Sequence, residues 1–600
     1  MMLTQQIRQA ALAALHYFYP NETFTPDMVS INETKAEFRG DYTVVLFPFV
    51  KMLRQKPDAL GAQIGGYLVE QYADLFAEYQ LVSGFLNLTV KDLFFTGMLQ
   101  QNWHNLSFGT HSGDGKRVMV EYSSPNTNKP LHFGHLRNIF LGYALGNILK
   151  ETGKEVIKAN LINDRGIHIC KSMVAWQDYA NGATPESTGI KGDHLVGDYY
   201  VKFNDVYKAE IKALVAEGMD EKLAEKEAPV MKRAQQMLRQ WEAGDTAVYK
   251  LWQTMNGWVY GGFEVSYKRL GVDFDKMYYE SNTYLLGKAI VEKGLEKGVL
   301  FRKEDNSVWI DLTEDGLDQK LLLRGDGTSV YITQDIGTAV LKYNDFKLDQ
   351  SVYVIADEQN YHMQVLKLIL KKLGEPCAEG IYHLSYGMVE LPTGRMKSRE
   401  GTVVDADDMM DEMKRMAQEQ TEQNGKAEGF SPDELDRLYT MIGMGALKFY
   451  LLRVDPKKKM IFDPKESIDL HGFTATFIQY AHARISSILR KEQLPLMPGT
   501  ERFSGYTTTQ ALAKGEKDIL VALERYPMVL QEAAGEMNPS VLCNYTFGLA
   551  QLFNTFYDQH SISKAESEEK KDLRLMMIVM SAQVMRHAMK LLGIALPEKM

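Results

Sequence analysis

The hydrophobic positions of this chain change their spacing several times, and the changes divide it into regions. Short apolar runs and helical stretches mix over the first hundred residues, until the glycine-containing tract His111–Gly115 breaks the pattern. Strand-like runs followed by amphipathic helices come next, and beyond about Asp463 only the helical spacing remains. The predicted regions are 1–112 (α+β), 113–395 (α/β), 396–462 (a mobile loop and a connecting stem) and 463–600 (an all-α bundle).

The region 113–395 has the rhythm of a doubly wound parallel sheet of the Rossmann type. One strand ends at Ser123, a second covers Val156–Ile162, and a helix follows each of them. Ligands of such sheets collect at the carboxyl ends of the strands. Long charged helices at about 182–268, such as Asp220–Trp241, interrupt the alternation as an insertion. Strand-like runs return at Val308–Leu312, Leu321–Leu323, Val330–Thr333 and Val352–Ala356.

Composition is that of an ordinary soluble globular protein with several domains. The 600 residues are too many for one core, and 45% are hydrophobic and 24% charged. A net charge of −10 gives no support to nonspecific adhesion to nucleic acid, although it leaves room for a local basic track. Three cysteines without a C-x-x-C pair favour buried thiols in a reducing compartment over disulfides or a zinc site. Without a signal-peptide layout or a membrane-spanning stretch, we expect a cytoplasmic protein that makes no membrane contact.

A pair of histidines at the start of a helix is the first candidate for chemistry. The strand Val118–Tyr122 leads to Lys129-Pro130-Leu131-His132-Phe133-Gly134-His135, and the apolar positions of 136–145 predict a helix directly afterwards. The first turn of a helix has unpaired N–H groups and a partial positive charge, which suit a phosphate. Gly134 allows close approach to the backbone because it has no Cβ. The two imidazoles would then lie beside a nucleoside triphosphate, unless they only cap and pack the helix start.

Two further groups of donors support the same interpretation. Asn126, Lys129 and Arg137 surround the histidine turn with side chains suited to phosphate or carboxylate oxygens. The segment Gly394–Thr402 has three cations in five residues, which favours phosphate binding, although a charged loop is more often a solvated turn. The presence of both motifs on one nucleotide-type sheet favours the functional interpretation.

These motifs resemble those of the class I aminoacyl-tRNA synthetases. His132-Phe133-Gly134-His135 is similar to their HIGH element, and Arg395-Met396-Lys397-Ser398-Arg399 to a divergent KMSKS loop. Within the class, the run Val120–Arg137 follows the arginyl-tRNA synthetase family almost position by position. Tyr331-Ile332-Thr333-Gln334-Asp335 resembles that family's arginine-pocket segment, and Phe477–Arg484 the start of its anticodon-binding helices. The resemblance covers the chain from about Gly115 to its end.

The resemblance implies a reaction in two steps. L-arginine and ATP, carried with Mg²⁺, would form arginyl-adenylate and pyrophosphate, and the arginine would then pass to the 3′-terminal ribose of tRNA(Arg). The catalytic residues, acting by charge stabilisation and positioning rather than as bases, would be His132, His135, Lys129, Lys397 and Arg399. The ATP-binding residues would be His132, Gly134, His135, Met396, Lys397 and Ser398. No zinc or other protein-bound metal is expected.

The same resemblance implies a pocket for the arginine side chain. Its guanidinium is planar with five donors, so a selective site needs a carboxylate that accepts a fork of hydrogen bonds. Asp335 would be that carboxylate and Glu280 a second one, while Tyr331 would supply a flat wall and a hydroxyl. The residues that would hold the amino and carboxylate ends, beside His135, are Ser124, Asn126 and Gln359.

Two positions depart from the family pattern. The fourth place of the KMSKS-like loop usually holds a cation and is Ser398 here, so we expect Lys129 to serve the α-phosphate instead. Gln334 stands where many relatives have an arginine, which changes the local hydrogen-bond network but leaves Asp335 in place.

Contacts with RNA are expected at both ends of the chain. Aromatic and cationic side chains together read single-stranded RNA loops. In and before the first helix of the bundle, these residues are Tyr480, His482, Arg484, Lys457 and Lys458. By the resemblance, the N-terminal region would touch the elbow of the transfer RNA, and the RNA would be needed before the first step. We expect the enzyme to be a monomer.

Two other interpretations stay open at this stage. One is a class I synthetase for glutamate or cysteine, but cysteine recognition needs a zinc-binding thiolate and glutamate recognition an arginine-rich pocket. The other is a synthetase-like RNA-binding regulator that has lost catalysis. The intact His132, His135, Lys129 and Asp335 argue against the regulator.

Overall fold

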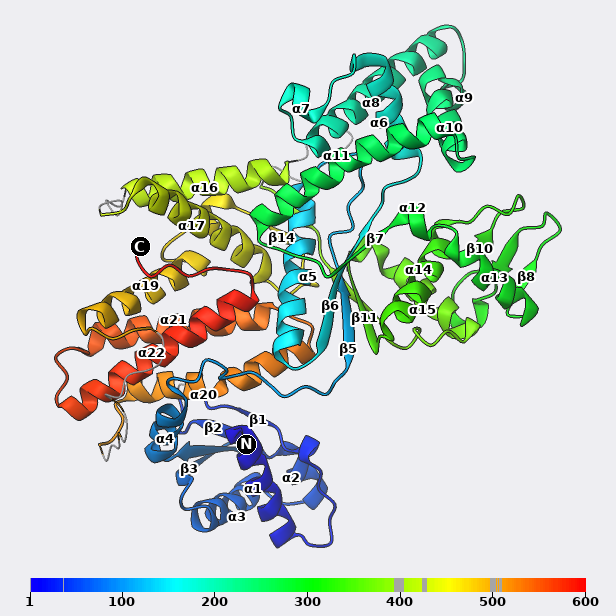
Figure 1. Cartoon of the computed structure of the whole chain (residues 1–600). Helices are drawn as coiled ribbons and strands as arrows, with labels where there is room; N and C mark the ends of the chain where they lie inside the picture. Colours follow the sequence, from blue (N-terminus) through cyan, green and yellow to red (C-terminus); the bar gives the residue numbers. More distant parts are fainter. Residues whose placement is uncertain are drawn as a thin grey trace.

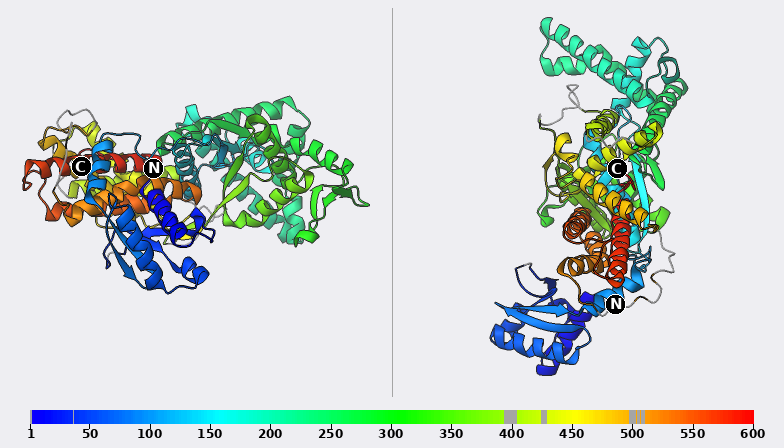
Figure 2. Two further views of the ribbon diagram at one scale, coloured as in Figure 1. Left: turned by 90° about the horizontal axis from the view of Figure 1, so that it is seen from below. Right: turned by 90° about the vertical axis from the view of Figure 1, so that its left-hand side faces the viewer.

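The computed structural model describes residues 2–35, 37–392, 404–423, 429–496, 503, 506 and 510–600. Figure 1 shows a central sheet with the long helix α5 (Phe133–Glu151) beside it and the C-terminal bundle on the other side of that helix. The right-hand view of Figure 2 places the helical insertion and the N-terminal region at opposite ends of the molecule. The sheet and α5 therefore lie at the centre, between all the other parts.

The N-terminal region is built on a described four-stranded antiparallel sheet in the order β1-β2-β4-β3. Its first helix buries Leu3, Ile7 and Leu15 along one face, which is the spacing of an amphipathic helix on a core. The elements are α1 (Leu3–Phe18), β1 (Ile31–Glu33), β2 (Tyr42–Val45), α2 (Phe47–Leu53), α3 (Pro57–Gln71), β3 (Phe76–Val82), β4 (Phe85–Val90) and α4 (Asp92–Asn102).

Five described strands form the parallel central sheet that the α/β rhythm predicts. In sheet order they are β12 (Ile381–Tyr386), β11 (Gln350–Ala356), β5 (Arg117–Glu121), β6 (Glu155–Ile162) and β7 (Lys276–Tyr279). The chain winds from β5 to β6 and β7 on one side, and later adds β11 and β12 on the other. The winding direction therefore reverses between β5 and β11, where ligands of doubly wound sheets bind. Since the histidine turn follows β5, it lies at this switch point.

The predicted insertion is a group of helices between β6 and β7. They are α6 (Ile167–Tyr179), α7 (Pro185–Thr188), α8 (Gly192–Ala216), α9 (Glu221–Glu227), α10 (Pro229–Glu242) and α11 (Thr246–Leu270). The predicted single helix Asp220–Trp241 is wrong, because it divides at Ala228. Pro229 lacks an N–H and begins α10, the helix position where proline costs least.

The chain between β7 and β11 corrects a second prediction. Its elements are α12 (Glu280–Thr283), α13 (Leu286–Glu296), the antiparallel strands β8 (Leu300–Arg302), β9 (Val308–Ile310) and β10 (Lys320–Leu323), and α14 (Tyr331–Phe346). The predicted strand Val330–Thr333 is wrong, because Tyr331 begins α14. Ile332, Ile336 and Ala339 are buried at helical spacing, which a window of four residues does not reveal.

The C-terminal part is helical, as predicted. After β12 come β13 (Val389–Glu390), α16 (Ala406–Gln423), α17 (Pro432–Leu452), β14 (Met460–Ile461), α18 (Pro464–Ser467), α19 (Ala475–Lys491), α20 (Lys514–Gly535), α21 (Ser540–Gln559) and α22 (Glu568–Leu591). A continuous hydrophobic core extends from the N-terminal region through α5 into this bundle. Within the described ranges, no helix combines the length and apolarity that crossing a bilayer requires. The exact residue limits of the four regions stay predictions.

Candidate active site

The histidine turn closes on itself through its two imidazole rings. His132 is the N-cap of α5, and its Nδ1 accepts a hydrogen bond from the Gly134 N–H at 3.1 Å. The His135 Nδ1 accepts in return from the His132 N–H at 3.0 Å, and the ring centroids lie 3.8 Å apart. Because both Nδ1 atoms accept, each neutral ring carries its proton on Nε2 and can donate that N–H to a ligand.

Burial keeps both imidazoles neutral. Desolvation, together with the nearby Lys129 cation, lowers the pKa of His132 to about 4. Desolvation and His132 hold the pKa of His135 well below its usual value. Imidazoles of such low basicity are poor general bases at neutral pH, whereas their Nε2–H groups remain good donors to phosphate oxygens. The local electrostatics therefore fit charge stabilisation.

Gly134 is required by the neighbouring ring. A Cβ on this residue would lie 3.0 Å from both Cε1 and Nδ1 of His132, which is tighter than ordinary van der Waals contact. A side chain here would make the imidazole shift by a few tenths of an ångström. The glycine thus preserves the ring geometry, and the predicted close approach of a ligand stays a proposal.

A cavity of about 650 Å³ opens between the histidine turn and the helical insertion. Asn126, Lys129 and His132 line it from the turn, and His168 and His194 line it from α6 and α8. Desolvation lowers the pKa of Lys129, so its ammonium is less hydrated than that of a surface lysine. Such an ammonium gains more from pairing with an anion than a fully solvated one does.

The segment that follows the KMSKS-like loop returns to the histidine turn. The Phe133 N–H donates to the Val404 carbonyl at 2.9 Å, and the Ala406 N–H donates to the Leu131 carbonyl at 3.0 Å. His132 and Asp405 face each other in the resulting antiparallel bridge. Residues 393–403 lie outside the described part of the chain, so the predicted roles of Met396, Lys397, Ser398 and Arg399 stay proposals.

Two carboxylates influence each other where the arginine pocket is predicted. The Asp335 Oδ2 lies 2.6 Å from Nε2 of His362, on α15 (Asn360–Leu373), and this bond raises the pKa of His362. Burial raises the pKa of Glu280 to about 7; Arg165 opposes the shift, while the charges of Asp164 and Asp335 add to it. Glu280 is thus close enough to Asp335 for the Asp335 charge to raise its pKa. A guanidinium placed between them would relieve that repulsion.

The other predicted pocket residues follow strands or begin a helix, and most of their side chains are more exposed to solvent than Glu280 and Asp335. Ser124 and Asn126 follow β5, and Gln359 follows β11; the last two are exposed. The Ser124 backbone has a left-handed φ of 45°, and its N–H donates to the Asn160 Oδ1 at 3.0 Å. Tyr331 is 79% exposed in the first turn of α14. It therefore forms no wall in this structure, and its contact with arginine stays a proposal.

A buried ion pair near Asp335 was not predicted. The Glu121 carboxylate at the end of β5 contacts the Lys342 ammonium of α14, and both side chains are almost completely buried. Although desolvation opposes it, the Glu121 charge raises the pKa of Lys342, which also senses Asp335. The Lys342 Nζ lies 4.5 Å from the centroid of the Tyr353 ring. The sequence did contain a clue to this ion pair, since Glu121 and Lys342 each stand on the apolar face of a strand or helix.

Arg137 is a structural residue, and the prediction that it contributes to anion binding is wrong. Its side chain is fully buried. Its guanidinium donates to the carbonyls of Gly387 at 2.5 Å, Lys458 at 2.8 Å and Asp455 at 3.2 Å. These bonds attach the first turns of α5 to the loops after β12 and α17.

The residues predicted to contact RNA differ in their exposure to solvent. Tyr480 and Arg484 are partly exposed on α19, with the Arg484 guanidinium 4.8 Å from the centroid of the Tyr480 ring, and Lys457 and Lys458 are exposed after α17. His482 is fully buried, and its Nδ1 lies 2.8 Å from the Pro597 carbonyl. The predicted RNA contact of His482 is therefore wrong. Residues four apart share a helix face, whereas a residue two positions along points away from it.

One group among the described residues has the geometry to hold a metal ion. Ligand atoms of His194, Asp405 and Asp407 lie within 4.8 Å of one another. Asp407 already contacts the Lys191 Nζ at 2.5 Å and the Arg269 guanidinium at 3.0 Å. A divalent cation would meet two positive charges at close range, so the group is better described as an ion-pair cluster. The absence of a protein-bound metal stays a prediction.

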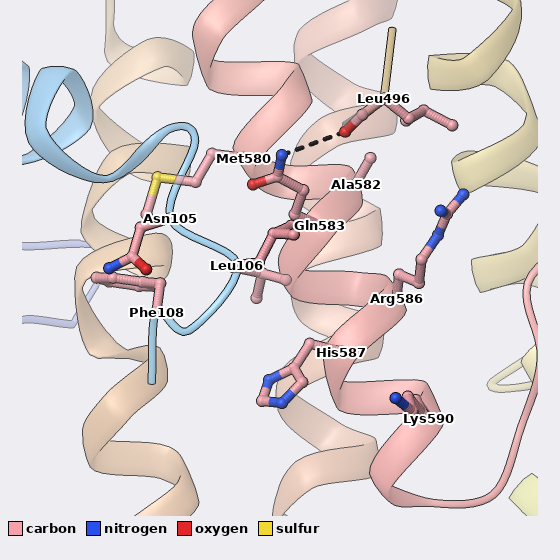
Figure 3. A pocket seen from close by; sticks show the side chains of 11 residues that line it. Asn105, Leu106, Phe108, Leu496, Met580, Ala582, Gln583, Arg586, His587 and Lys590 are labelled. Atoms are coloured by element: carbon pink, nitrogen blue, oxygen red, sulfur yellow. Dashed lines mark hydrogen bonds between the residues drawn. The ribbon is translucent and has the colours of Figure 1, made fainter. Parts of the chain in front are cut away.

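A second cavity, of about 180 Å³, lies where the linker before β5 meets α22 (Figure 3). Phe108, Leu496 and His587 are among its lining residues. The His587 Nδ1 lies 2.6 Å from the Tyr526 hydroxyl, and its Nε2 lies 3.3 Å from Glu151, the last residue of α5. This cavity therefore belongs to the joint between the bundle and the end of α5 opposite the histidine turn.

Comparison with known families first shows to which class of protein this chain belongs. The family model described as "tRNA synthetases class I (R), catalytic domain" matches residues 98–463, and the one described as "DALR anticodon binding domain" matches residues 478–600. The first match places the sheet and its insertion among the catalytic domains of class I aminoacyl-tRNA synthetases.

Relatives of the same length show which family within this class the chain resembles. The arginine–tRNA ligase of Amoebophilus asiaticus is 50% identical, with 95% of this chain and 96% of the relative covered. That of Parabacteroides distasonis is 48% identical over the whole of both. The chain belongs to the arginyl-tRNA synthetase family.

Solved structures agree on the fold. The arginyl-tRNA synthetase of Thermus thermophilus, at 23% identity, covers the whole of both chains with a TM-score of 0.78. That of Plasmodium falciparum reaches the same TM-score at 17% identity, over 100% of this chain and 99% of its own. The predicted family and fold class are confirmed.

Proposed function

We propose that this chain activates L-arginine with ATP, releasing pyrophosphate, and then transfers the arginine to the 3′-terminal ribose of tRNA(Arg). The observation that carries this proposal is the position of two acidic residues, Glu280 and Asp335, near enough that the Asp335 charge helps to raise the pKa of Glu280, an arrangement that suits a guanidinium. The histidine turn at the switch point of the same sheet supplies donors suited to ATP. Relatives named arginine–tRNA ligase, at 48–50% identity over nearly the whole chain, support the same activity.

In the first step, an oxygen of the arginine carboxylate attacks the α-phosphorus of ATP. The bond from that phosphorus to the bridging oxygen breaks in line, and pyrophosphate leaves. His132 and His135 donate their Nε2–H groups to phosphate oxygens, and Lys129 adds a positive charge at the α-phosphate. Mg²⁺ arrives with ATP as part of the substrate and offsets phosphate charge. Positioning and electrostatic stabilisation supply the catalysis, because no protein group needs to form a covalent bond.

Amino-acid selection follows from the charge of the pocket. Arginine fits because its planar head donates forked hydrogen bonds to a carboxylate. Lysine has a charge but no fork, and citrulline has the shape but no charge. Either one would leave Glu280 or Asp335 poorly satisfied, and the cost of a half-buried carboxylate without its partner provides the discrimination.

In the second step, the arginine passes from the adenylate to the transfer RNA. The 2′-hydroxyl of the terminal ribose attacks the carbonyl carbon of the arginyl-adenylate and loses its proton, the bond from that carbon to the phosphate oxygen breaks, and AMP leaves. Tyr480, Arg484, Lys457 and Lys458 contact the anticodon region, and the N-terminal region contacts the elbow. The enzyme acts as a cytoplasmic monomer and needs its RNA for the first step. Three buried cysteines without a disulfide fit a reducing compartment.

The test is pyrophosphate exchange into ATP with each amino acid in turn, with and without tRNA(Arg). We expect exchange with arginine alone among the amino acids, and only when the RNA is present. Exchange supported by another amino acid would refute the pocket assignment. No exchange under any condition would instead support an RNA-binding protein without catalysis.

A further inference from the structure

The helical insertion is attached to the segment that pairs with the histidine turn by a cluster of charged and polar side chains. The cluster connects α8 and α11 of the insertion with the start of α16. We call it the insertion clamp, and it consists of Lys191, His194, Ser266, Arg269, Asp405 and Asp407.

Asp407 is the firmly held member of the insertion clamp. The Lys191 Nζ lies 2.5 Å from its Oδ2, and Ser266 Oγ and Arg269 contact its oxygens at 3.2 and 3.0 Å. Although burial opposes it, the nearby positive charges of His194, Lys191 and Arg269 keep the pKa of Asp407 well below its usual value. This carboxylate therefore has partners on α8 and α11 whether or not His194 is present.

Asp405 depends on His194 to a greater degree. The His194 Nε2 lies 3.2 Å from the Asp405 Oδ2 and 3.5 Å from the nearer Asp407 oxygen. Its N–H points squarely at neither oxygen, so the contact is an ion pair shared by two carboxylates. Together these carboxylates raise the pKa of His194 to about 10, and the ring is a cation at neutral pH. Among the ion pairs of the described residues, Asp405 pairs with His194 alone.

Asp405 is also the residue that meets the histidine turn. Its Oδ1 accepts the Asp407 N–H at 2.7 Å and so caps α16, while its Oδ2 faces His194. Its main chain forms the antiparallel bridge with His132, with hydrogen bonds on both sides from the neighbouring residues. One residue therefore connects the insertion, the start of α16 and the backbone of a catalytic histidine.

We propose that His194 is a positioning residue for arginine activation: by pairing with Asp405, it fixes residues 404–406 against residues 131–133 and so keeps the His132 Nε2–H aligned with the triphosphate. The proposal deepens the proposed function and rests on it. Without the imidazolium, Asp405 would lose its own cationic partner while Lys191 and Arg269 stay with Asp407, and the bridge to His132 would lose its support from the insertion. Misplacement of a catalytic group by a fraction of its contact distance is enough to slow a step that depends on alignment.

His194→Gln tests the proposal in the full-length enzyme with tRNA(Arg), by pyrophosphate exchange at varied ATP and arginine. We expect kcat per active site to fall roughly tenfold, as for one misaligned donor, while KM for arginine changes by less than about twofold. KM for arginine is spared because the guanidinium carboxylates lie on α12 and α14. His194→Lys restores a cation and should recover most of the lost rate. A control is Arg233→Gln, which removes an ion pair to Asp178 inside the insertion and should leave the rate unchanged.

A double-mutant cycle separates this role from a merely structural one. Asp405→Asn keeps an oxygen that caps α16 but loses the charge that His194 pairs with. If His194 acts through Asp405, the double variant should be no slower than Asp405→Asn alone. The proposal is overturned by a His194→Gln kcat close to the wild-type value, by a KM for arginine that rises as much as kcat falls, or by multiplying effects in the double variant. Inactivity of the wild-type enzyme with arginine would count against the proposed function and not against the role of His194.

Discussion

Asp335→Asn is the substitution that examines the arginine pocket most directly. It keeps the size of the side chain and one oxygen acceptor, and it removes the charge. Asp335 pairs with His362 at 2.6 Å, and its side chain is 38% exposed, so a ligand can reach it. The histidine turn does not contact Asp335 through any hydrogen bond of the described residues. The substitution should therefore weaken the binding of arginine and leave the binding of ATP almost unchanged.

The expected loss follows from the contacts that remain. Removing one partner of a hydrogen-bonded pair of charges across an interface costs about 2–5 kcal/mol, and the partial exposure of Asp335 places this loss in the lower part of that range. Glu280 persists as a second acceptor, and its pKa falls once the neighbouring Asp335 charge is gone. We expect a loss of about 2–3 kcal/mol, which is roughly a 30- to 160-fold decrease in kcat/KM for arginine. KM for ATP should stay within about twofold of the wild-type value.

Asp345→Asn is the matched control. It makes the same chemical change on the same helix, at a carboxylate that accepts a hydrogen bond from the Tyr278 hydroxyl at 3.0 Å. Exchange kinetics at varied arginine should be near normal for this variant. If Asp335→Asn, correctly folded, lowers kcat/KM for arginine by less than about threefold, the guanidinium binds elsewhere and the reasoning fails.

Other predictions follow from single contacts. Arginine should bind more weakly as the pH falls from about 8 to 6, because the Glu280 carboxyl, whose pKa burial raises to about 7, then gains a proton and loses its charge; titration calorimetry should show this, and Glu280→Gln should flatten the dependence. Lys129→Ala should slow single-turnover activation at least about tenfold, and a near-normal rate would assign the role to a cation within 393–403. Arg137→Met should lower the free energy of unfolding by about 3–5 kcal/mol, since three buried carbonyls lose their donor; an unchanged denaturation midpoint would contradict this. Cys170 should resist thiol reagents in the native protein, because burial raises its pKa to about 12; rapid labelling before unfolding would show that the thiol is accessible.

Local patterns in the sequence were enough to find most elements and the histidine turn. The N-cap, the glycine and the apolar face of α5 all lie within a few turns of one another, so no distant contact is needed to recognise them. The same holds for β5, β6 and the four bundle helices. The predictions are wrong at Val330–Thr333, where four residues are too few to show a helical period, and at Pro229, where proline divides a long helical pattern.

Only the tertiary structure decided which charged groups meet. A period of 3.6 or 2 residues shows which face of an element is apolar, but it does not show which distant segment covers that face. Arg137 and His482 have the composition of ligand-binding residues, yet packing buries both against backbone carbonyls. Glu280 with Asp335, and His194 with Asp405, come from separate elements that the tertiary fold brings together. The sequence by itself therefore determined the motif and the family, whereas folding determined the partners of each charge, because a pKa depends on burial and on neighbours that are distant along the chain.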